Sequence, residues 1–274
     1  MQNYSYHMHT NTLGVYDGHN SAEEMIEKAE QVGFAKIGIS NHMAFHPNMP
    51  NQSQMFFSDF DQACDIYKRT IEEIRTVSLK SRIDVKIGFE VDFFSSATWR
   101  ILFEKMQKEL NADYYISATH YLRDKTEKYI MNLYYLKRHP EIRIDDENIT
   151  VYLNNYWDNI IESIKSGYFD FIAHLDVCKL FGYCLTPEWD ERKWETIEVL
   201  AKYKQPYELN TSGWVKVGEQ HPHTWMVEEL NKRNVPVIVS DDAHSVEMLA
   251  QHFDQAENLL KTLNYQNRYC PNFK

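Results

Sequence analysis

The stretch that decides the predicted fold covers residues 3–42 and reads NYSYHMHTNTLGVYDGHNSAEEMIEKAEQVGFAKIGISNH. Its two ends, 3–8 and 35–40, are short runs of aromatic or β-branched residues that are typical of strands. Between them, Ser21-Ala-Glu-Glu24 has the form of a helix capping box, and Gly33 suits the end of a helix. Strand, helix and strand in this order predict two parallel strands joined by a crossover helix.

The same alternation continues along the rest of the chain. Further strands are predicted at 84–91, 113–119, 168–173, 206–210 and 235–240, and further helices at 59–80, 96–110, 148–166, 187–204 and 222–233. Without a linker or a compositional break, this alternation predicts one domain over residues 1–274. We expect an α/β fold whose seven strands close into a (β/α)7 TIM-like barrel, with the active site at the C-terminal strand ends.

Composition narrows the classes of function. With 29 Lys and Arg against 40 Asp and Glu, the net charge is −11, and such a chain repels a phosphate backbone, so no nucleic-acid partner is expected. The mean hydropathy of −0.57 and the absence of a long apolar run or a signal-peptide pattern predict a cytoplasmic protein without a membrane partner. Its four cysteines show no zinc-finger or CxxC spacing, and we expect free thiols.

Histidines and carboxylates follow the predicted strands, and six of the twelve histidines lie at strand ends. Residues i and i+2 of a strand point the same way, so His7 and His9 present two imidazoles to one side. The same spacing joins Asp242 to His244. The remaining strand-end candidates are His42, Glu90, His120 and His174. All of them are expected at one rim of the barrel.

A buried cluster of this kind predicts a metal centre, because neighbouring buried carboxylates are costly unless cations compensate them. Imidazole nitrogen and carboxylate oxygen without thiolate suit Zn, Mn or Fe. The candidates outnumber the ligands of one four-coordinate ion, so we predict two or three divalent metal ions. In the first loop, Asp17 or His19 could reach back as a further ligand, and Asp17 is the preferred choice.

Other polar residues near the predicted strand ends have weaker signals. Asp92 and Asp176 lie two residues beyond ligand candidates and are expected either to orient an imidazole or to serve as caps. The histidines without strand-end placement are His46, His139, His221, His223 and His252. We expect most of these five at the surface.

The ordered set of motifs resembles the PHP family, named for polymerase and histidinol phosphatase, and within it the PHP-type histidinol-phosphate phosphatases. The matching motifs are His7-Met-His9-Thr10, Asp17-Gly-His19, Ser21-Ala-Glu-Glu-Met25, Ile39-Ser-Asn-His42, Gly88-Phe-Glu90, Ile116-Ser-Ala-Thr-His120-Tyr, Ile172-Ala-His174-Leu-Asp176, Glu208-Leu-Asn210-Thr-Ser-Gly213 and Ser240-Asp-Asp242-Ala-His244-Ser. They span residues 5–245 in family order. A single HxH is a weak motif, whereas the ordered set is specific.

This resemblance implies a distorted seven-stranded barrel with a trinuclear centre of Zn, Mn or Fe and the hydrolysis of phosphate monoesters. The implied ligands are His7, His9, Asp17, His42, Glu90, His120, His174, Asp242 and His244. The implied substrate is L-histidinol phosphate, which gives L-histidinol and phosphate in histidine biosynthesis. Two departures concern substrate recognition: Trp214-Val215-Lys216 stands where many of these phosphatases have an arginine, and Asp241 is an additional acid.

For the reaction, we expect a metal-bridging hydroxide to attack phosphorus in line. The candidates for protonating the leaving alcohol are Asp242 and His244, and the sequence does not choose between them. Positive side chains near the mouth could bind phosphate oxygens, and the candidates are Lys179, Arg123 and Lys216.

Several alternatives to a histidinol-phosphate phosphatase remain. The chain could hydrolyse another small phosphate ester, or an amide or lactone, although no strand lysine near His120 offers itself as a metal bridge. A nuclease is disfavoured by the acidic composition. A non-catalytic PHP-like binding module could survive the loss of ligands, whereas here all candidates are present. The oligomeric state is left open.

Overall fold

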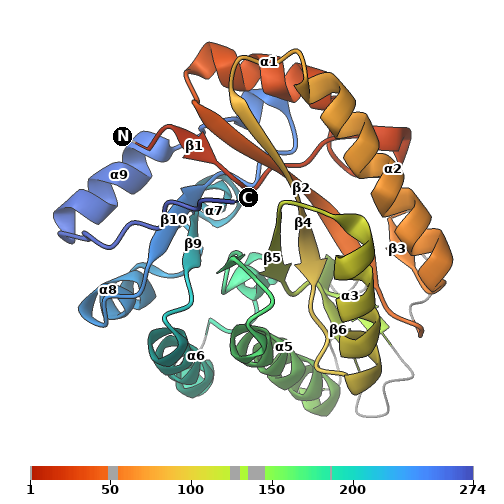
Figure 1. Ribbon diagram of the computed structural model, residues 1–274. Helices are drawn as coiled ribbons and strands as arrows, with labels where there is room; N and C mark the ends of the chain where they lie inside the picture. Colours follow the sequence, from red (N-terminus) through yellow and green to blue (C-terminus); the bar gives the residue numbers. More distant parts are fainter. Residues whose placement is uncertain (1, 49–54, 124–129, 135–145, 186, 274) are drawn as a thin grey trace.

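Seven parallel strands form a nearly closed ring in the computed structural model, which describes residues 2–48, 55–123, 130–134, 146–185 and 187–273 (Figure 1). The ring order is β1 (Tyr4–Ser5), β2 (Lys36–Phe45), β4 (Asp84–Asp92), β5 (Tyr114–Ala118), β8 (Phe171–Ile172), β9 (Tyr207–Asn210) and β10 (Val237–Ser240). A parallel bridge between Met8 and Ala243 connects the two ends of this order. The predicted distorted (β/α)7 barrel is confirmed.

Helices surround the ring of strands (Figure 1). They are α1 (Ala22–Val32), α2 (Phe60–Ser78), α3 (Ala97–Leu110), α5 (Asp146–Ser166), α6 (Asp190–Tyr203), α8 (Thr224–Lys232) and α9 (Phe253–Thr262). The first six match the helices predicted from the sequence to within a few residues. Two more were not predicted, α9 and the short α7 (Ser212–Val217), which follows β9 directly.

The start of α1 shows how local sequence sets an element. The Ser21 side chain accepts a hydrogen bond from the Glu24 amide, and the Glu24 carboxylate accepts one from the Ser21 amide, so the predicted capping box is present. Gly33 ends the helix with a φ of 91°, in the left-handed region. The buried side chains of α1, Met25 and Ile26 among them, lie one helical turn apart from Ala29 and pack on the core.

Several elements near the C-terminal strand ends have no counterpart in the sequence prediction. They are β3 (Phe56–Phe57), which pairs in parallel with the last residues of β2, and the antiparallel hairpin of β6 (Tyr121–Arg123) and β7 (Ile130–Asn132). The short 3-10 turns η1 (Thr12–Gly14), η3 (Val177–Phe181) and η5 (Val246–Met248) were not predicted either, whereas η4 (Pro187–Trp189) lies at the start of the helix predicted at 187–204. The first and fifth strands are shorter than predicted, with two residues each in β1 and β8.

The barrel interior is filled by a small apolar cluster distinct from the main core. Along β5, Tyr114, Ile116 and Ala118 belong to this cluster, whereas Tyr115 belongs to the main core. Because alternate residues of a strand point to opposite faces, the small cluster lies inside the ring. His120, two residues beyond Ala118, therefore continues the same inward face toward the C-terminal end.

The C-terminal segment closes the other end of the barrel. The ring of Phe273 stacks on Tyr114 with centroids 4.5 Å apart and contacts Tyr6 edge-on at 4.9 Å. Figure 1 accordingly shows the C-terminus at the centre of the ring of strands. The polar strand ends and this aromatic plug thus occupy opposite ends of the same interior.

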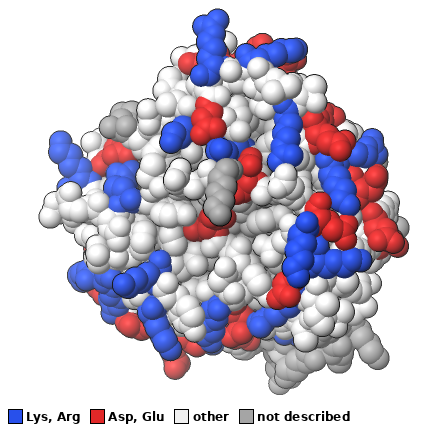
Figure 2. Space-filling view, viewed as in Figure 1, with Lys and Arg blue, Asp and Glu red and all other residues white. Residues whose placement is uncertain are grey.

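Charges and thiols follow the composition. On the face seen in Figure 2, basic and acidic side chains are interspersed around the periphery, without one continuous basic field. Among the described residues, none of the helices combines the length and the apolar character that crossing a membrane requires. All four cysteines are free, and three of them are buried.

Replacing Gly88 with alanine is expected to destabilise the barrel. A Cβ at this position would lie 2.5 Å from ring carbons of Tyr114, and such overpacking typically costs about 1–3 kcal/mol. Urea denaturation should therefore give a lower midpoint for Gly88→Ala. In a Tyr114→Ala background, the same substitution should cost much less, because the ring that it meets is gone. Equal costs in the two backgrounds would contradict this packing.

Candidate metal centre

The C-terminal strand ends bring together all nine predicted ligands. Each belongs to at least one of four overlapping groups of ligand atoms that lie within 4.8 Å of one another. The groups are His9, Asp17, His42 and His244; His7, Glu90 and His174; His7, His9 and Asp242; and His42, Glu90 and His120. Most of these side chains are buried, and Asp17 is the most open, with 39% of its side chain exposed.

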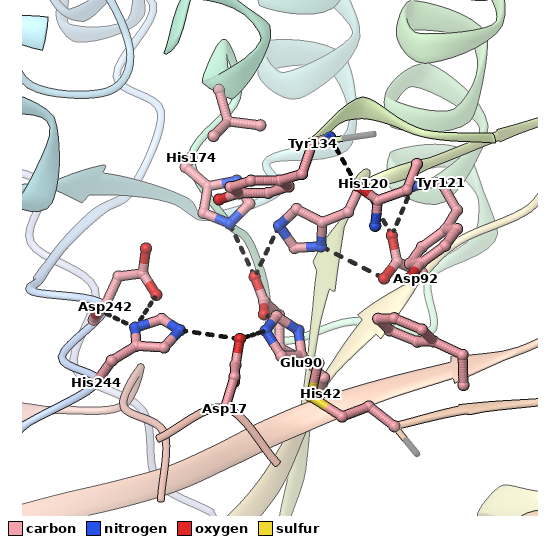
Figure 3. Close-up of a pocket in the computed structure, with 14 residues that line it drawn as sticks. Asp17, His42, Glu90, Asp92, His120, Tyr121, Tyr134, His174, Asp242 and His244 are labelled. Carbon is pink, nitrogen blue, oxygen red and sulfur yellow. Dashed lines mark hydrogen bonds and ion pairs between the residues drawn. The ribbon is translucent and has the colours of Figure 1, made fainter. Parts of the chain in front are cut away.

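Glu90, near the end of β4, lies at the middle of the cluster (Figure 3). Its Oε1 atom lies 2.8 Å from Nε2 of His174 and 3.3 Å from Nε2 of His7. Its Oε2 atom lies 2.8 Å from Nδ1 of His42 and 3.6 Å from Nε2 of His9. The two oxygens of one buried carboxylate therefore face different sets of imidazoles, so each oxygen could be a ligand of a different cation.

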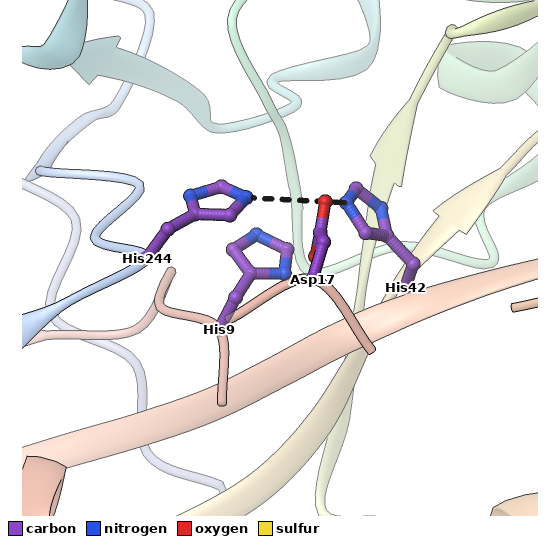
Figure 4. Close-up of side chains that lie close together, drawn as sticks. All are labelled: His9, Asp17, His42 and His244. Carbon is purple, nitrogen blue, oxygen red and sulfur yellow. Dashed lines mark ion pairs between the residues drawn. The ribbon is translucent and has the colours of Figure 1, made fainter. Parts of the chain in front are cut away.

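Asp17 completes the outer group of the cluster (Figure 4). Its Oδ2 atom lies 3.4 Å from Nε2 of His42 and 3.6 Å from Nε2 of His244. The ring of His9 stacks on that of His244 at 4.2 Å. His19, the alternative loop residue, is exposed and belongs to none of the four groups. The geometry thus favours Asp17 as the loop ligand.

Asp242 holds an unusual backbone conformation directly after β10. Its φ of 50° lies in the left-handed region, which non-glycine residues rarely adopt and which is found at functional sites. In this conformation Oδ1 lies 3.3 Å from Nε2 of His9 and 3.5 Å from Nε2 of His7. Oδ2 lies 3.3 Å from Nζ of Lys216. The strained turn aims the carboxylate into the cluster.

Buried atoms without hydrogen-bond partners test whether this cluster fits metal ions. They include Nε2 of His7, both ring nitrogens of His9 and Oε2 of Glu90. Buried polar groups are nearly always paired, so orphaned atoms of this type need an explanation. Imidazole nitrogens and carboxylate oxygens that converge without thiolate are ligands for Zn, Mn or Fe. The residues present therefore fit several divalent ions, as predicted.

The electrostatics explain how such a cluster folds. Burial, together with the neighbouring imidazoles of His244 and His42, lowers the pKa of His9 to about 3, so this ring is neutral. Burial also acts to lower the pKa of His7, but carboxylates, Glu208 first among them, outweigh burial and raise it well above its ordinary value. In the metal-free protein, protons on some imidazoles thus balance the buried carboxylates.

The two predicted orienting carboxylates differ. Asp92 accepts hydrogen bonds from the His120 amide at 2.6 Å and from the His120 Nδ1 atom at 3.3 Å. These contacts are the ones expected of a carboxylate that orients the His120 ring. Asp176 instead accepts from Nδ1 of His221 at 2.8 Å. A sequence argument based on distance along the chain could not find this partner, because His221 lies in the loop after α7.

The prediction of surface positions is wrong for two histidines. His221 and His46 are buried, with 1% and 2% of their surface exposed. The first is buried because β9 and the loop after α7 pair through a bridge between Asn210 and His221. His223 and His252 are partly exposed, and His139 lies outside the described residues.

The three candidate phosphate-binding cations lie at different distances from the centre. Lys216 contacts Asp242 and is partly exposed. Lys179 is buried, with Nζ 2.5 Å from the Gln220 carbonyl oxygen and 3.2 Å from Oδ2 of Asp176. Arg123 lies at the end of β6, where its amide donates to Asn155. Lys216 thus touches a predicted ligand, and Lys179 touches one of the two predicted orienting carboxylates.

A cavity of about 630 Å³ opens above the cluster. One side is formed by the predicted ligands, including Glu90 and Asp242. The other side is apolar and aromatic and consists of Met55, Phe56, Tyr121, Tyr134 and Val177, with Asn132 beside them (Figure 3). Tyr121 and Asn132 lie in the hairpin of β6 and β7, and Tyr134 follows it two residues later. This hairpin was not predicted from the sequence.

Sequence reasoning also gave no role to Glu208, although it lies in a quoted motif. This carboxylate is fully buried in β9 and accepts from Nδ1 of His7 at 2.6 Å. A usable signal existed: in the predicted strand 206–210, Glu208 shares a face with Asn210. A charged residue on the inward face of a buried strand needs partners there.

A nearly closed parallel barrel with overlapping histidine and carboxylate groups at its C-terminal rim defines a class, the α/β barrels built to hold several metal ions. A family model described as PHP domain matches residues 5–212. The chain therefore belongs to the PHP family.

Similar proteins have been named in three organisms. A curated protein named "Probable histidinol-phosphatase", from Deinococcus radiodurans, is 26% identical over 243 residues, which cover 87% of this chain and 85% of that protein. A Listeria monocytogenes structure described as "putative histidinol phosphatase hisK" has a TM-score of 0.70 at 18% identity and covers 92% of this chain and 99% of its own. Histidinol phosphate phosphatase from Lactococcus lactis, in complex with Zn, L-histidinol and phosphate, has a TM-score of 0.69 at 15% identity and covers 99% of this chain and 97% of its own. At these identities, the two structures show the shared fold.

Metal binding is expected to release protons and to strengthen as the pH rises. Burial lowers the pKa of His7 and His42, but nearby carboxylates outweigh burial and raise both well above the ordinary value. These rings are protonated at neutral pH and must lose the proton to bind a metal. Calorimetric titration with Zn²⁺ should show heats that depend on the buffer's ionisation enthalpy, and the affinity should rise between about pH 6 and about pH 8.

The control is His252→Ala, since His252 lies outside the four groups. This variant should keep the wild-type affinity at each pH. Zinc binding that is independent of pH, with no proton release, would contradict the charge balance described above.

Proposed function

We propose that this chain is a metal-dependent phosphomonoesterase of the PHP family, and that it hydrolyses L-histidinol phosphate to L-histidinol and phosphate. One observation carries the proposal: nine histidine and carboxylate side chains converge, seven of them line one side of a cavity, and several buried ligand atoms make no hydrogen bond. The names of the relatives from D. radiodurans and L. lactis support this choice of substrate.

When bound, divalent ions in such a site acidify water to give the nucleophile and offset charge on the phosphoryl group. In the metal-free protein, the carboxylates and the imidazoles hold one another in position around Glu90. Lys216 Nζ lies beside Asp242 at the edge of the centre, which supports it as a contact for a phosphate oxygen. Asp242 and His244 remain our two candidates for protonating the leaving alcohol.

The aromatic residues on the far wall of the cavity favour a leaving group that carries a planar ring. Tyr134 is 40% exposed and packs edge-on against Phe181 at 4.8 Å. Phe56 contacts Tyr121 edge-on at 4.5 Å. Aromatic faces of this kind favour a planar ring such as imidazole by offset or edge-to-face contact. A leaving group that places its phosphate on the metals would carry its ring toward this wall.

Turnover by the purified protein tests the proposed activity. With added Mn²⁺ or Zn²⁺, the chain is expected to release phosphate from histidinol phosphate faster than from a panel of sugar and nucleotide monophosphates. A chelator should abolish the activity, and restored metal should recover it. Asp242→Ala should lose most of the metal content and nearly all turnover while keeping the circular-dichroism spectrum of the fold.

Each contrary result points elsewhere. Slow, equal rates across the panel would contradict histidinol phosphate as the substrate and favour another small phosphate ester. This outcome is worth testing because Val215 and Lys216 stand where many of these phosphatases have an arginine. A metal-loaded protein that is inert on every ester would favour the binding module.

Removing the aromatic wall is expected to affect the ring-bearing substrate selectively. Tyr134→Ala should raise KM for histidinol phosphate up to about tenfold, because an aromatic contact is worth about 0.5–1.5 kcal/mol. The value for an aliphatic ester such as glycerol phosphate should change little. Tyr203→Ala is the matched control, since this exposed tyrosine lies at the end of α6. An equal rise in KM for both substrates would show that Tyr134 does not determine substrate specificity.

A further inference from the structure

Glu208 is a buried carboxylate whose hydrogen-bonding capacity is filled from four parts of the barrel. Oε1 accepts from Nδ1 of His7 and from Oγ of Ser240, both at 2.6 Å. Oε2 accepts from the His174 amide at 2.8 Å and from Nδ2 of Asn210 at 3.0 Å. The side chain has no exposed surface. A fully buried acid with four donors around it is held in a single orientation.

This contact determines which nitrogen of His7 can bind a metal. An ionised carboxylate only accepts, so the hydrogen bond at 2.6 Å requires the proton of a neutral His7 ring to sit on Nδ1. The lone pair then lies on Nε2. That atom is buried without a hydrogen-bond partner and lies 3.3 Å from Oε1 of Glu90 and 3.5 Å from Oδ1 of Asp242.

The same carboxylate also positions His174. Its other oxygen accepts from the His174 backbone amide just after β8, one residue beyond Ala173, whose amide still donates to the Ser117 carbonyl oxygen. Nε2 of His174 lies 2.8 Å from Oε1 of Glu90, the same oxygen that His7 faces. One side chain from β9 thus connects both histidines of the group formed by His7, Glu90 and His174.

We propose that Glu208 is a positioning residue of the metal centre, which sets His7 in the Nδ1–H tautomer and aligns His7 and His174 on one ion. The inference rests on the proposed metal centre. It adds Glu208, which is not itself a predicted ligand, as the residue that holds His7 and His174 in place. The group formed by His9, Asp17, His42 and His244 does not include His7 or His174. Loss of Glu208 should therefore weaken one metal position and spare that other group.

Glu208→Gln is the direct test, because the amide keeps the shape and replaces one acceptor with a donor. Whichever way the amide turns, its NH2 group meets either Nδ1 of His7 or the His174 amide, so one hydrogen bond is lost or the His7 tautomer is reversed. We expect the affinity for one equivalent of Zn²⁺ to fall about 10–100-fold. The equivalent held by His9, Asp17, His42 and His244 should bind as in the wild type.

Three comparisons separate positioning from general damage. Asp170→Asn is the control, a carboxylate-to-amide change at the opposite end of the barrel, where Asp170 accepts from the Tyr115 amide; it should keep all equivalents of zinc. Glu208→Asp keeps the charge and should recover part of the lost affinity. Nitrogen-15 NMR of the metal-free wild type at a pH where His7 is neutral should place the ring proton on Nδ1.

The outcomes are distinct. Full zinc affinity in Glu208→Gln, or a wild-type His7 with its proton on Nε2, would overturn the assignment, and the second measurement stands even where the variant does not fold. Zinc and NMR results as expected, from a protein without phosphatase activity, would sustain this inference while refuting the proposed function.

Discussion

The structure depends on one electrostatic constraint, the burial of the Glu90 carboxylate among imidazoles. Only 1% of Glu90 is exposed, and histidines from β2 and from the segments after β1 and β8 lie within 3.6 Å of its oxygens. A buried carboxylate is tolerated only when positive charge or hydrogen bonds compensate it. In the metal-free protein, that compensation comes from protons on imidazoles, and the pKa of Glu90 falls well below its ordinary value although burial alone would raise it.

The barrel accommodates the buried carboxylate because its interior has an apolar end and a polar end. One end is closed by aromatic rings: Phe273 stacks on Tyr114 and meets Tyr6 edge-on. Gly38 and Gly88 leave room for the Tyr114 ring between neighbouring strands. The same strand faces become polar toward the C-terminal end. In β2, Ser40 and then His42 follow Gly38 on one face, and in β4 Glu90 follows Gly88 on one face. The rigid apolar end therefore positions the polar end.

The sequence predicts much of this because strand ends and metal ligands are both local signals. The spacing of His7 and His9, or of Asp242 and His244, is readable within three residues, and parallel strands carry such pairs to one rim. The β6–β7 hairpin, the burial of His221 and the plug formed by Phe273 are not local, since each depends on a partner far along the chain. Two-residue strands such as β8 are also shorter than their apolar runs suggest.

Carboxylates that are not themselves predicted ligands orient two histidines of the centre. His7 receives its orientation from Glu208, and His120 lies against Asp92, so two imidazoles of the centre each have a carboxylate at Nδ1 and turn Nε2 toward Glu90. Such carboxylate partners raise the basicity of an imidazole and fix its ring. The same negative charges raise the proton affinity of the rings, so metal ions and protons compete for them. A barrel that places its carboxylates in this way holds its site in shape before any ion arrives, and it makes occupancy depend on pH through the ligands themselves.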